Sequence, residues 1–470
     1  MHELPKTKII ATIGPSTWDD DTLTEMINYG FTVARVNASF ADFDEQERVI
    51  TQLRRLSPKV AVMLDTMGHK VRVTGFDKDR VIAPGDEIIL LSEKNKSKKR
   101  NSIKVTYPTL EKDVTRNTKI LIDDGNIELK VKDIVGKEVV CEVIHGGVLK
   151  KRKTVNVPGV HLNFPALSEK DETDIKNAVK LGYDFISASF VRNLEDVKLV
   201  REAMGKSDLK LIAKIEDYEG VRNFDKILEK VDGIMVARGD LGVELPLEEV
   251  PILQKQFIQK CRMKGKIVIV ATQMLESMRE STRPTRAETS DVANAVMDGA
   301  DAVMLSAETS TGKNPVETVK HMARIAKRAE EVLRPQIVEG RTDAYEISDI
   351  ICKHLFGITE EVALKGVIIF SDSGNTVKSL ARHRLNIPIW CVSNNHKIIR
   401  QQQMIRGVTG IYVENMESDR DEIAKHAVSA IYGRGYLEMG DKVAIISGGT
   451  VHNRRYNTIL EILEVQAVLE

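Results

Sequence analysis

The stretch Leu209-Lys-Leu-Ile-Ala-Lys-Ile-Glu216 is the most informative part of this sequence for its fold. It is rich in Leu, Ile and Ala and ends at a polar turn, a pattern typical of a buried strand. Because side chains alternate between the two faces of a strand, Lys214 and Glu216 point the same way. They are either a solvated ion pair where the strand meets its loop or part of a site that holds a metal and a phosphate. The stretch alone leaves both interpretations open.

Seven other apolar runs complete a regular series with this one. The expected strands are residues 8–12, 32–36, 60–65, 184–190, 209–216, 233–237, 267–272 and 302–305. Amphipathic helix patterns lie between most of them, for example at residues 194–204, 221–231, 248–264 and 315–333. Strands that alternate with helices form parallel sheets with right-handed crossovers. Eight such units predict an α/β fold with a closed (β/α)8 barrel, the TIM barrel.

Two regions do not follow this series. Residues 68–163 have no good helix pattern but hold short β-like runs at residues 86–91, 119–123, 127–131 and 138–143. We therefore predict an inserted all-β domain, a small β-barrel at residues 69–163, within the barrel domain of residues 1–68 and 164–335. Insertions in a βα loop lie over the barrel mouth, so we expect a lid. Strand-like runs at residues 367–370, 389–392, 410–413 and 442–447 predict an open-sheet α/β domain at residues 336–470, with a regulatory role.

Composition excludes several classes of protein. The 470 residues include 69 Lys and Arg and 69 Asp and Glu, so the net charge is zero, which argues against a dedicated nucleic-acid binder. No apolar stretch approaches the length of a membrane span, and the first residues are not typical of a signal peptide. The cysteines, Cys141, Cys261, Cys352 and Cys391, are scattered without metal or redox spacing. We expect buried, reduced thiols, a cytoplasmic location and no membrane or nucleic-acid partner.

Polar residues follow seven of the predicted strands, where barrel enzymes place their active sites. They are Arg35, Asn37 and Ser39; Asp65 and Thr66; Ser189; Lys214 and Glu216; Gly239 and Asp240; Thr272 and Gln273; and Ser306 and Glu308. Any single one could serve only the chemistry of a turn. As a set, they lack the histidines and paired cysteines typical of zinc sites and the triads of covalent hydrolases.

The carboxylates in this set indicate a metal. Glu216 and Asp240 follow adjacent strands, and such hard oxygen ligands favour Mg²⁺ or Mn²⁺. Arg35 and Lys214 supply positive charge for a phosphate or an enolate. Gly239 lets a substrate approach the backbone closely. The residues therefore predict a Mg²⁺-dependent barrel enzyme that acts on a small anionic substrate, with a phosphorylated one favoured.

Six ordered motifs resemble the pyruvate kinase family. They are Lys8-Ile-Ile-Ala-Thr-Ile-Gly-Pro-Ser16, Val33-Ala-Arg-Val-Asn37, Ile212-Ala-Lys-Ile-Glu216, Met235-Val-Ala-Arg-Gly-Asp-Leu-Gly242, Ala271-Thr-Gln-Met-Leu-Glu-Ser277 and Arg283-Pro-Thr-Arg-Ala-Glu288. The resemblance runs from residue 6 to about residue 334 and more weakly to the C-terminus. It implies Mg²⁺-dependent phosphoryl transfer from phosphoenolpyruvate to ADP, which gives pyruvate and ATP in the last step of glycolysis. It also implies a homotetramer.

The resemblance also implies a role for each matching residue. Glu216 and Asp240 are similar to the Mg²⁺ ligands, and Lys214 to the group that stabilises the transferring phosphoryl group. Arg35 is similar to the contact with the substrate phosphate. The backbone of Gly239 and Asp240, with Thr272, resembles the cradle for the substrate carboxylate. Thr272 is also expected to help relay a proton to the enolate. The implied nucleotide contacts are Arg72 and Lys170, and the implied ligands of a monovalent cation, K⁺ in many members, are Asn37, Ser39, Asp65 and Thr66.

The segment Asp65-Thr-Met-Gly-His-Lys-Val-Arg72 departs from the family pattern Asp-Thr-Lys-Gly-Pro-Glu-Ile-Arg. Lys70 replaces the glutamate, and its ammonium group could replace the charge of the monovalent cation. We therefore expect K⁺ to be dispensable; the alternative is that Lys70 points to solvent. Met67 replaces a lysine, Phe40 a histidine and Asn163 an aspartate. These changes put the rate or the nucleotide choice in doubt, but not the reaction.

Two further motifs allow a structural and a functional interpretation. Thr285 and Glu288 fit a helix capping box, and in the family this segment also lies near the active site at a subunit contact. The loop Ser371-Asp-Ser-Gly-Asn-Thr376 could cradle the phosphate of an allosteric effector with Ser371, Ser373, Gly374, Asn375 and Thr376, or be an ordinary capped turn. For the whole chain, a Mg²⁺-dependent lyase or aldolase and a non-enzymatic, effector-sensing barrel are the competing hypotheses.

Overall fold

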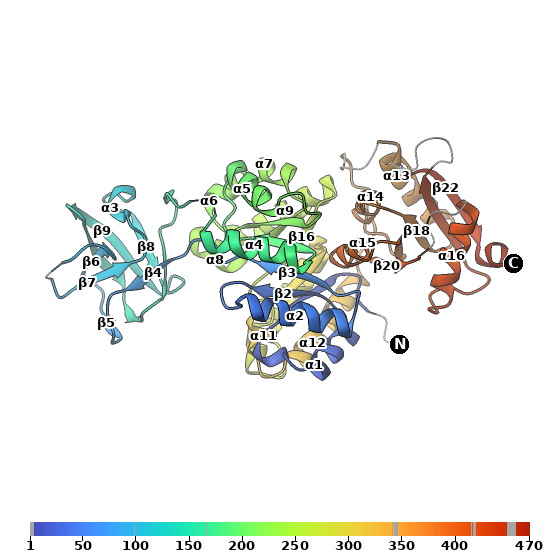
Figure 1. Cartoon of the computed structure of the whole chain (residues 1–470). Helices are drawn as coiled ribbons and strands as arrows, with labels where there is room; N and C mark the ends of the chain where they lie inside the picture. The colour runs from blue at the N-terminus through green and yellow to red at the C-terminus, as the bar shows by residue number, and fades with distance from the viewer. Residues whose placement is uncertain are drawn as a thin grey trace.

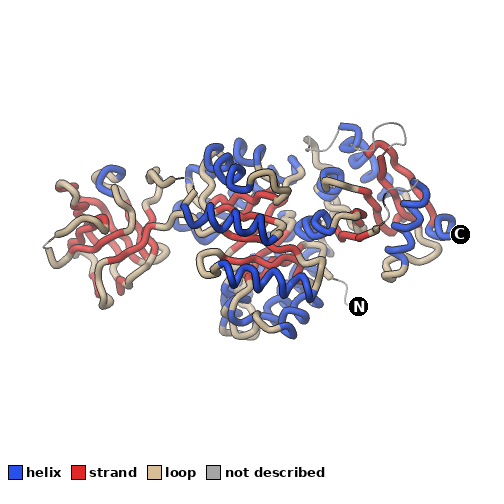
Figure 2. Tube along the Cα trace, viewed as in Figure 1, coloured by secondary structure: helices blue, strands red, loops and turns tan. Residues whose placement is uncertain are grey.

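The computed structural model describes residues 4–97, 99–165, 167–340, 342, 346–414, 416, 420–448 and 457–470. Figure 1 shows three bodies in a row, with a β domain at one end, an α/β barrel in the middle and a second α/β domain at the other end. Figure 2 shows that strands dominate the first body and that helices surround the strands of the other two. The predicted order of fold types along the chain is therefore confirmed.

The central body is a closed barrel of eight parallel strands. They are β1 (Lys8–Thr12), β2 (Phe31–Asn37), β3 (Ala61–Asp65), β13 (Phe185–Ala188), β14 (Lys210–Ile215), β15 (Gly233–Ala237), β16 (Ile267–Ala271) and β17 (Ala302–Leu305). Each strand pairs with its neighbour in the series, and β1 closes the ring by pairing with β17. All eight predicted strands are present, with ends that differ by up to two residues. The largest difference is at β13, which ends at Ala188 before Ser189 and Phe190 turn away.

Helices surround this barrel and pack their apolar faces on it. The main ones are α1 (Asp20–Asn28), α2 (Phe43–Leu56), α4 (Glu169–Leu181), α5 (Leu194–Met204), α9 (Glu249–Lys264), α10 (Arg286–Asp298) and α12 (Pro315–Glu330). The single helix predicted at residues 221–231 is wrong. Two short helices, α6 (Tyr218–Arg222) and α7 (Phe224–Lys230), occupy this region instead. The Asp217 side chain caps α6, and the Asn223 side chain between the helices donates to the Arg192 carbonyl.

The β domain is inserted between β3 and α4. Seven of its strands close into a second barrel: β4 (Val71–Thr74), β6 (Glu87–Ser92), β7 (Ser102–Val105), β8 (Lys119–Ile122), β9 (Ile127–Val135), β10 (Glu138–His145) and β12 (Thr154–Asn156). The strands β5 (Arg80–Ile82) and β11 (Gly147–Leu149) form a separate pair. The four predicted runs correspond to β6, β8, β9 and β10. The other strands and the one-turn helix α3 (Leu110–Asp113) were not predicted; each is three or four residues long.

The two connections to the β domain lie side by side on the barrel. The rings of His69 and Phe164, one from each connection, are stacked with centroids 5.0 Å apart. The backbone N–H groups of Met67 and Gly68 donate to the Asp171 carboxylate on α4. Gly68 has φ +68°, and a side chain there would lie 2.8 Å from Ser189 and Phe190. Glycine is therefore required where the chain leaves the barrel.

The C-terminal domain is an open five-stranded sheet in the order β20-β19-β18-β21-β22. The parallel strands β18 (Leu364–Phe370), β19 (Ile389–Ser393), β20 (Val408–Tyr412) and β21 (Lys442–Gly448) match the prediction, but the antiparallel edge strand β22 (Asn457–Glu464) was missed. Helices α13 (Glu346–Glu361), α14 (Asn375–Ala381), α15 (His396–Gln401) and α16 (Arg420–Tyr432) accompany the sheet, and α17 (Val465–Leu469) ends the chain. All four cysteines are free and buried, as predicted. Within the described ranges, no helix combines the length and apolarity needed to cross a membrane.

Candidate active site

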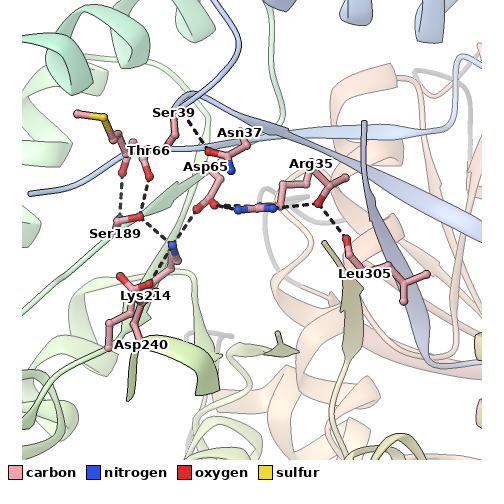
Figure 3. Close-up of polar contacts among 12 residues, drawn as sticks. Arg35, Asn37, Ser39, Asp65, Thr66, Ser189, Lys214, Asp240 and Leu305 are labelled. Atoms are coloured by element: carbon pink, nitrogen blue, oxygen red, sulfur yellow. Dashed lines mark hydrogen bonds and ion pairs between the residues drawn. The ribbon is translucent and has the colours of Figure 1, made fainter. Parts of the chain in front are cut away.

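Three charged side chains form the centre of the site at the C-terminal ends of β2, β3 and β14. The Arg35 guanidinium donates through Nε to Asp65 Oδ2 at 2.8 Å and through Nη1 to Thr12 Oγ1 at 2.9 Å. Lys214 Nζ lies 3.3 Å from the other oxygen of Asp65. Figure 3 shows Asp65 between the two cations. The carboxylate thus fixes both positive groups at the barrel mouth.

These groups hold one another in their charged forms. Burial alone would raise the pKa of Asp65, but the charges of Arg35 and Lys214 outweigh it and lower that pKa. Burial alone would lower the pKa of Lys214, but Asp65 and Glu216 outweigh it and raise that pKa. Lys214 is therefore a permanent cation at physiological pH, as a group that stabilises transferring negative charge must be.

Lys214 and Glu216 face the same way, with Nζ and Oε1 3.0 Å apart. The two side chains are 11% and 0% exposed, so the interpretation as a solvated ion pair is wrong. Lys214 also donates to Ser189 Oγ at 2.8 Å, and Ser189 Oγ donates to the Thr66 carbonyl at 2.6 Å. Every donor of the ammonium group is therefore directed into the site, which a solvated pair would not require.

Glu216 and Asp240 fit a divalent cation. Glu216 Oε2 accepts the Phe190 N–H at 2.6 Å, and its buried Oε1 lies 3.0 Å from Lys214 Nζ. Asp240 lies in the first turn of α8 (Arg238–Glu244), directly after the neighbouring strand β15. The described residues contain no group of three or more His, Cys, Asp or Glu side chains that could hold a metal. A cation here would complete its shell with water or substrate oxygens, which is the habit of Mg²⁺.

The two carboxylates differ in their electrostatic environment. Burial raises the pKa of Glu216 to about 7, despite the nearby charge of Lys214. Burial also opposes ionisation of Asp240, but the charges of Lys70 and Lys214 outweigh it and lower the pKa. A buried carboxylate with a raised pKa gains most from a bound cation, because the cation compensates for lost hydration.

Lys70 does not point to solvent. Its Nζ donates to Asp240 Oδ1 at 2.9 Å and lies 5.5 Å from the centre of the Phe190 ring. Its side chain is 29% exposed. The alternative of a solvated lysine is therefore wrong, and the ammonium charge lies within the candidate site, beside a predicted metal ligand.

The four predicted ligands of a monovalent cation gather around the ends of β2 and β3 (Figure 3). Asn37 Oδ1 accepts the Ser39 N–H at 3.0 Å, and Thr66 Oγ1 accepts the Ser189 N–H at 2.9 Å. Asp65 is already paired with two cations. The predicted oxygen ligands are thus close together, but these contacts already occupy part of their capacity to bind an ion.

Thr272 and Gly239 form the opposite wall of the site. Thr272 Oγ1 accepts the Gly239 N–H at 2.7 Å and donates to the Ala271 carbonyl at 2.6 Å. A side chain at Gly239 would meet Thr272 only at 3.4 Å or more, an ordinary contact. Packing within the protein therefore does not demand this glycine, whereas a ligand against the backbone would.

The two predicted nucleotide contacts lie in different domains. Arg72 is on β4 in the β domain, and its Nη1 donates to the Arg152 carbonyl at 2.9 Å. Lys170 is on α4 of the barrel, and its Nζ donates to the Ala38 carbonyl and to Asp174. Phe40, just beyond β2, is 87% exposed. The structure does not bring Arg72 and Lys170 together; a ligand would have to reach both.

A cleft of about 670 Å³ separates the β domain from the barrel. Lys70, Ser189, Phe190 and Asp240 line it from the site described above. Asn156 donates to Glu244 at 2.8 Å, and His161 Nδ1 lies 2.6 Å from Glu219 Oε2, so two side-chain contacts link the β domain to the barrel. No sequence pattern predicts these contacts, because each joins residues that are distant along the chain.

Two features named in the sequence have local structural partners. The capping box is present, with the Glu288 N–H donating to Thr285 Oγ1 and the Thr285 N–H to the Glu288 carboxylate. In the C-terminal domain, Ser371 Oγ accepts the Gly374 N–H at 2.8 Å, and Ser373 Oγ accepts the Asn375 N–H at 3.4 Å. Asn375 and Thr376 begin α14. The hydroxyl groups of Ser371 and Ser373 therefore accept hydrogen bonds from the turn itself.

Glu308 has a structural role as well, because it accepts the N–H groups of Leu275 and Ser306.

Comparison with known proteins agrees with this geometry. The family model for the pyruvate kinase barrel domain matches residues 4–319, and that for the pyruvate kinase alpha/beta domain matches residues 349–462. The pyruvate kinase of Geobacillus stearothermophilus is 41% identical over 476 residues, covering 99% of this chain and 81% of that protein. Those of Clostridium perfringens and Borreliella burgdorferi are 37% and 35% identical, covering 95% and 98% of this chain and 96% and 97% of theirs. The chain belongs to the pyruvate kinase family.

Proposed function

We propose that this chain transfers the phosphoryl group of phosphoenolpyruvate to ADP at the mouth of the barrel, with Lys214 as the main cationic group. As a member of its family the chain is a phosphotransferase that takes phosphoenolpyruvate and ADP and yields pyruvate and ATP. The observation that carries the assignment to this site is the buried contact of Lys214 with Glu216, one strand from Asp240. A permanent cation beside two carboxylates suits a phosphate held through a metal.

Lys214 and Arg35 would hold and neutralise the phosphoryl group. Both are buried cations, and Asp65 fixes both, so little reorganisation is needed when negative charge develops. Glu216 and Asp240 would hold the divalent cation, Mg²⁺ or Mn²⁺. When bound, such an ion neutralises phosphate and enolate oxygens. The remaining work of these side chains is alignment and exclusion of water.

The substrate carboxylate would bind at the backbone of Gly239 and Asp240, with Thr272 beside it. The Thr272 hydroxyl both accepts and donates a hydrogen bond, so it can pass a proton toward the methylene carbon of the enolate. The absence of a packing need for glycine at residue 239 supports this placement.

Residues 69–163 would act as a lid between the barrel segments 1–68 and 164–335, with residues 336–470 as a regulatory domain. The cleft between the β domain and the barrel supports this division, since residues of both line it, and Arg72 and Lys170 lie in different domains. Closure would bring both to the nucleotide phosphates and exclude water.

Lys70 would supply the charge that a monovalent cation gives in other members of the family. Its place beside Asp240 and the occupied oxygens of Asn37, Asp65 and Thr66 support a site that works without K⁺. Ser39 contributes its N–H to the same cluster. A strict K⁺ requirement in a K⁺-free assay would contradict this proposal.

A phosphorylated effector at Ser371–Thr376 and a homotetramer remain proposals that rest on the family. For the effector, phosphoenolpyruvate saturation should be measured with AMP and with sugar phosphates; no shift with any of them would contradict it. Light scattering of the purified protein gives the subunit number. A cytoplasmic location is proposed as well, supported by four free cysteines, which suit a reducing compartment.

The deciding experiment measures pyruvate and ATP from phosphoenolpyruvate and ADP with Mg²⁺. We expect both products in equal amounts from the wild type. A lyase would form pyruvate from other substrates without ATP, and an effector-sensing protein would form neither. The absence of ATP would contradict the proposed function.

A further inference from the structure

We propose that Arg238 is a positioning residue that holds Thr272 in the conformation needed for proton transfer. The inference rests on the role proposed above for Thr272, and it concerns a residue outside the predicted set. Arg238 begins α8 directly after β15, and its side chain is 13% exposed. It does not enter the group formed by Arg35, Asp65 and Lys214. Its contacts lead instead to the end of β16.

All five N–H donors of the Arg238 guanidinium have an acceptor. Nε donates to the Ala271 carbonyl at 3.3 Å, and Nη2 donates to the Thr272 carbonyl at 2.8 Å and to Met274 Sδ. Nη1 donates to Asp291 Oδ1 at 2.6 Å and to Gln254 Oε1 at 3.4 Å. The planar group thus spans two consecutive carbonyls on one side and two helices on the other. No other side chain offers five donors in a fixed fork.

The backbone between these carbonyls has an unusual conformation. Thr272 has φ 71° and Gln273 has φ 53°, both in the left-handed region. A β-branched residue adopts this conformation only when its surroundings hold it there. Here the conformation directs Thr272 Oγ1 to the Gly239 N–H at 2.7 Å. The guanidinium and the strained turn therefore determine together where the hydroxyl group lies.

The anchors of Arg238 belong to the rigid outer shell of the barrel. Asp291 is on α10 and Gln254 is on α9. Gln254 Nε2 also donates to Asp298 Oδ2 at 3.1 Å, which ties α9 to the end of α10. Through Arg238, two packed helices rather than a loop therefore hold the Thr272 hydroxyl in position.

The same strand offers a matched control. Asp232 immediately precedes β15, and its Oδ2 accepts from Arg201 Nη2 at 2.7 Å and from the Leu211 N–H. The Arg201–Asp232 pair lies at the start of β15, and the Arg238–Asp291 pair lies at its end. The first pair has no contact with the candidate site. Arg201→Met should therefore reveal the cost of losing such a pair without disturbing Thr272.

The test compares Arg238→Met, Arg238→Lys, Arg201→Met, Thr272→Ala and the double variant Arg238→Met/Thr272→Ala. Two rates are measured with Mg²⁺ present: ATP formation from phosphoenolpyruvate and ADP, and exchange of the pyruvate methyl protons in D₂O. The second is the reverse of enolate protonation and needs no ADP. Displacement of a reacting group by about 1 Å costs on the order of 100-fold, so we expect such a loss in the exchange rate of Arg238→Met.

Arg238→Lys should lie between the wild type and Arg238→Met, because three donors on one nitrogen cannot bridge both carbonyls and Asp291. Arg201→Met should keep both rates within about twofold. The double variant should be no slower than Thr272→Ala, since Arg238 acts through Thr272. If Arg238→Met does not fold, Asp291→Ala takes its place, with an expected loss of about fivefold in the exchange rate.

An exchange rate in Arg238→Met that stays within twofold of the wild type would overturn the inference. So would losses that multiply in the double variant, because they would show that Arg238 acts independently of Thr272. A wild type that exchanges pyruvate protons but forms no ATP would contradict the proposed function instead. The effect of Arg238 on exchange would still be measured in that case.

Discussion

The two ends of the barrel bury charge for different purposes. At the mouth, Asp65 pairs with both Arg35 and Lys214, and Lys214 also pairs with Glu216. At the opposite end, where the C-terminal domain packs, buried cations bind groups on the other side of the interface. Lys8 Nζ donates to the Val408 carbonyl, and Arg384 donates to Asp301 and to the Gly299 carbonyl.

This difference distinguishes a candidate binding site from a domain interface. The interface of the barrel with the C-terminal domain, around Lys8 and Arg384, is called the joint below. Backbone carbonyls that accept from Lys8 and Arg384 belong to the far side of the interface, so these charges fasten one domain to another. At the mouth the cations bind only side chains of the barrel, and an exposed cleft lies beside them. Conserved chemistry at the C-terminal face of a barrel serves catalysis, whereas the other face serves stability. Each prediction below changes one end and measures activity, stability or both.

The largest effect is expected at the mouth. Lys214→Met should lower ATP formation by about 10³-fold, the upper range for removing one group that stabilises developing charge. The variant should stay folded, because Arg35 still pairs with Asp65. Steady-state kinetics and a thermal unfolding curve test this. An active Lys214→Met variant would show that the buried pair at the mouth is structural, like those at the other end.

Arg384→Met is the corresponding change at the joint. It leaves Asp301 buried with less compensation, and breaking a buried pair costs about 3 kcal/mol or more. We expect a lower midpoint of urea unfolding and an unchanged kcat for ATP formation. A variant with wild-type stability and lost activity would reverse the assignment of the two ends.

Acid should weaken the joint before the mouth. Burial, reinforced by the charge of Arg382, lowers the pKa of His383 from 6.5 to about 4. Between these values the unfolded chain binds more protons than the folded one, so stability falls as pH falls from about 6.5 to about 4. The neutral ring accepts the Val338 N–H at 3.1 Å. His383→Gln should reduce the loss of unfolding free energy between pH 6.5 and 5 by about 1–2 kcal/mol.

That result requires unfolding measurements at several pH values on both proteins. An identical acid dependence in the wild type and in His383→Gln would assign the effect to other groups. The pKa of His383 also depends on the charges of Arg382, Asp349 and Arg262. Their contribution determines how steeply the unfolding free energy still changes with pH in the variant.

The smallest effect concerns Lys70 at the mouth. Lys70→Glu removes the ammonium group beside Asp240 and adds a carboxylate to a site that already has Asp65, Glu216 and Asp240. We expect about a tenfold loss of kcat without K⁺, equal to about 1.4 kcal/mol, and recovery when K⁺ is added. The wild type should respond little to K⁺. Equal responses of the two proteins would show that Lys70 does not replace the cation.

The sequence predicted the barrel well because its signal is strong and repeated. Buried parallel strands such as β14 and β15 are continuous apolar runs, and polar residues at their ends identify the mouth. The alternation of side chains along a strand predicted that Lys214 and Glu216 share one face of β14. The predicted strands of the C-terminal domain are present for the same reason.

Other features depend on contacts that a linear pattern does not contain. β22 has polar residues at its start and a half-exposed character, so it resembled a loop. Asn223 divides a predicted helix through a bond to the Arg192 carbonyl, a residue 31 positions away. Arg238 lies within a recognised motif, but its role depends on a turn after β16 whose conformation no residue preference predicts. The partner of Lys70 likewise became evident only from the structure.

The paired connections at His69 and Phe164 bring both ends of the β domain to one place on the barrel. The rings of His69 and Phe164, where the chain enters and leaves the domain, are stacked with centroids 5.0 Å apart. The inserted segment is therefore a closed loop, and the entropy cost of closing it depends only weakly on its length. The barrel would therefore tolerate replacement of everything between these rings by a short linker. The exchange of one lid for another from a relative is then an engineering route to altered nucleotide choice that leaves the barrel intact.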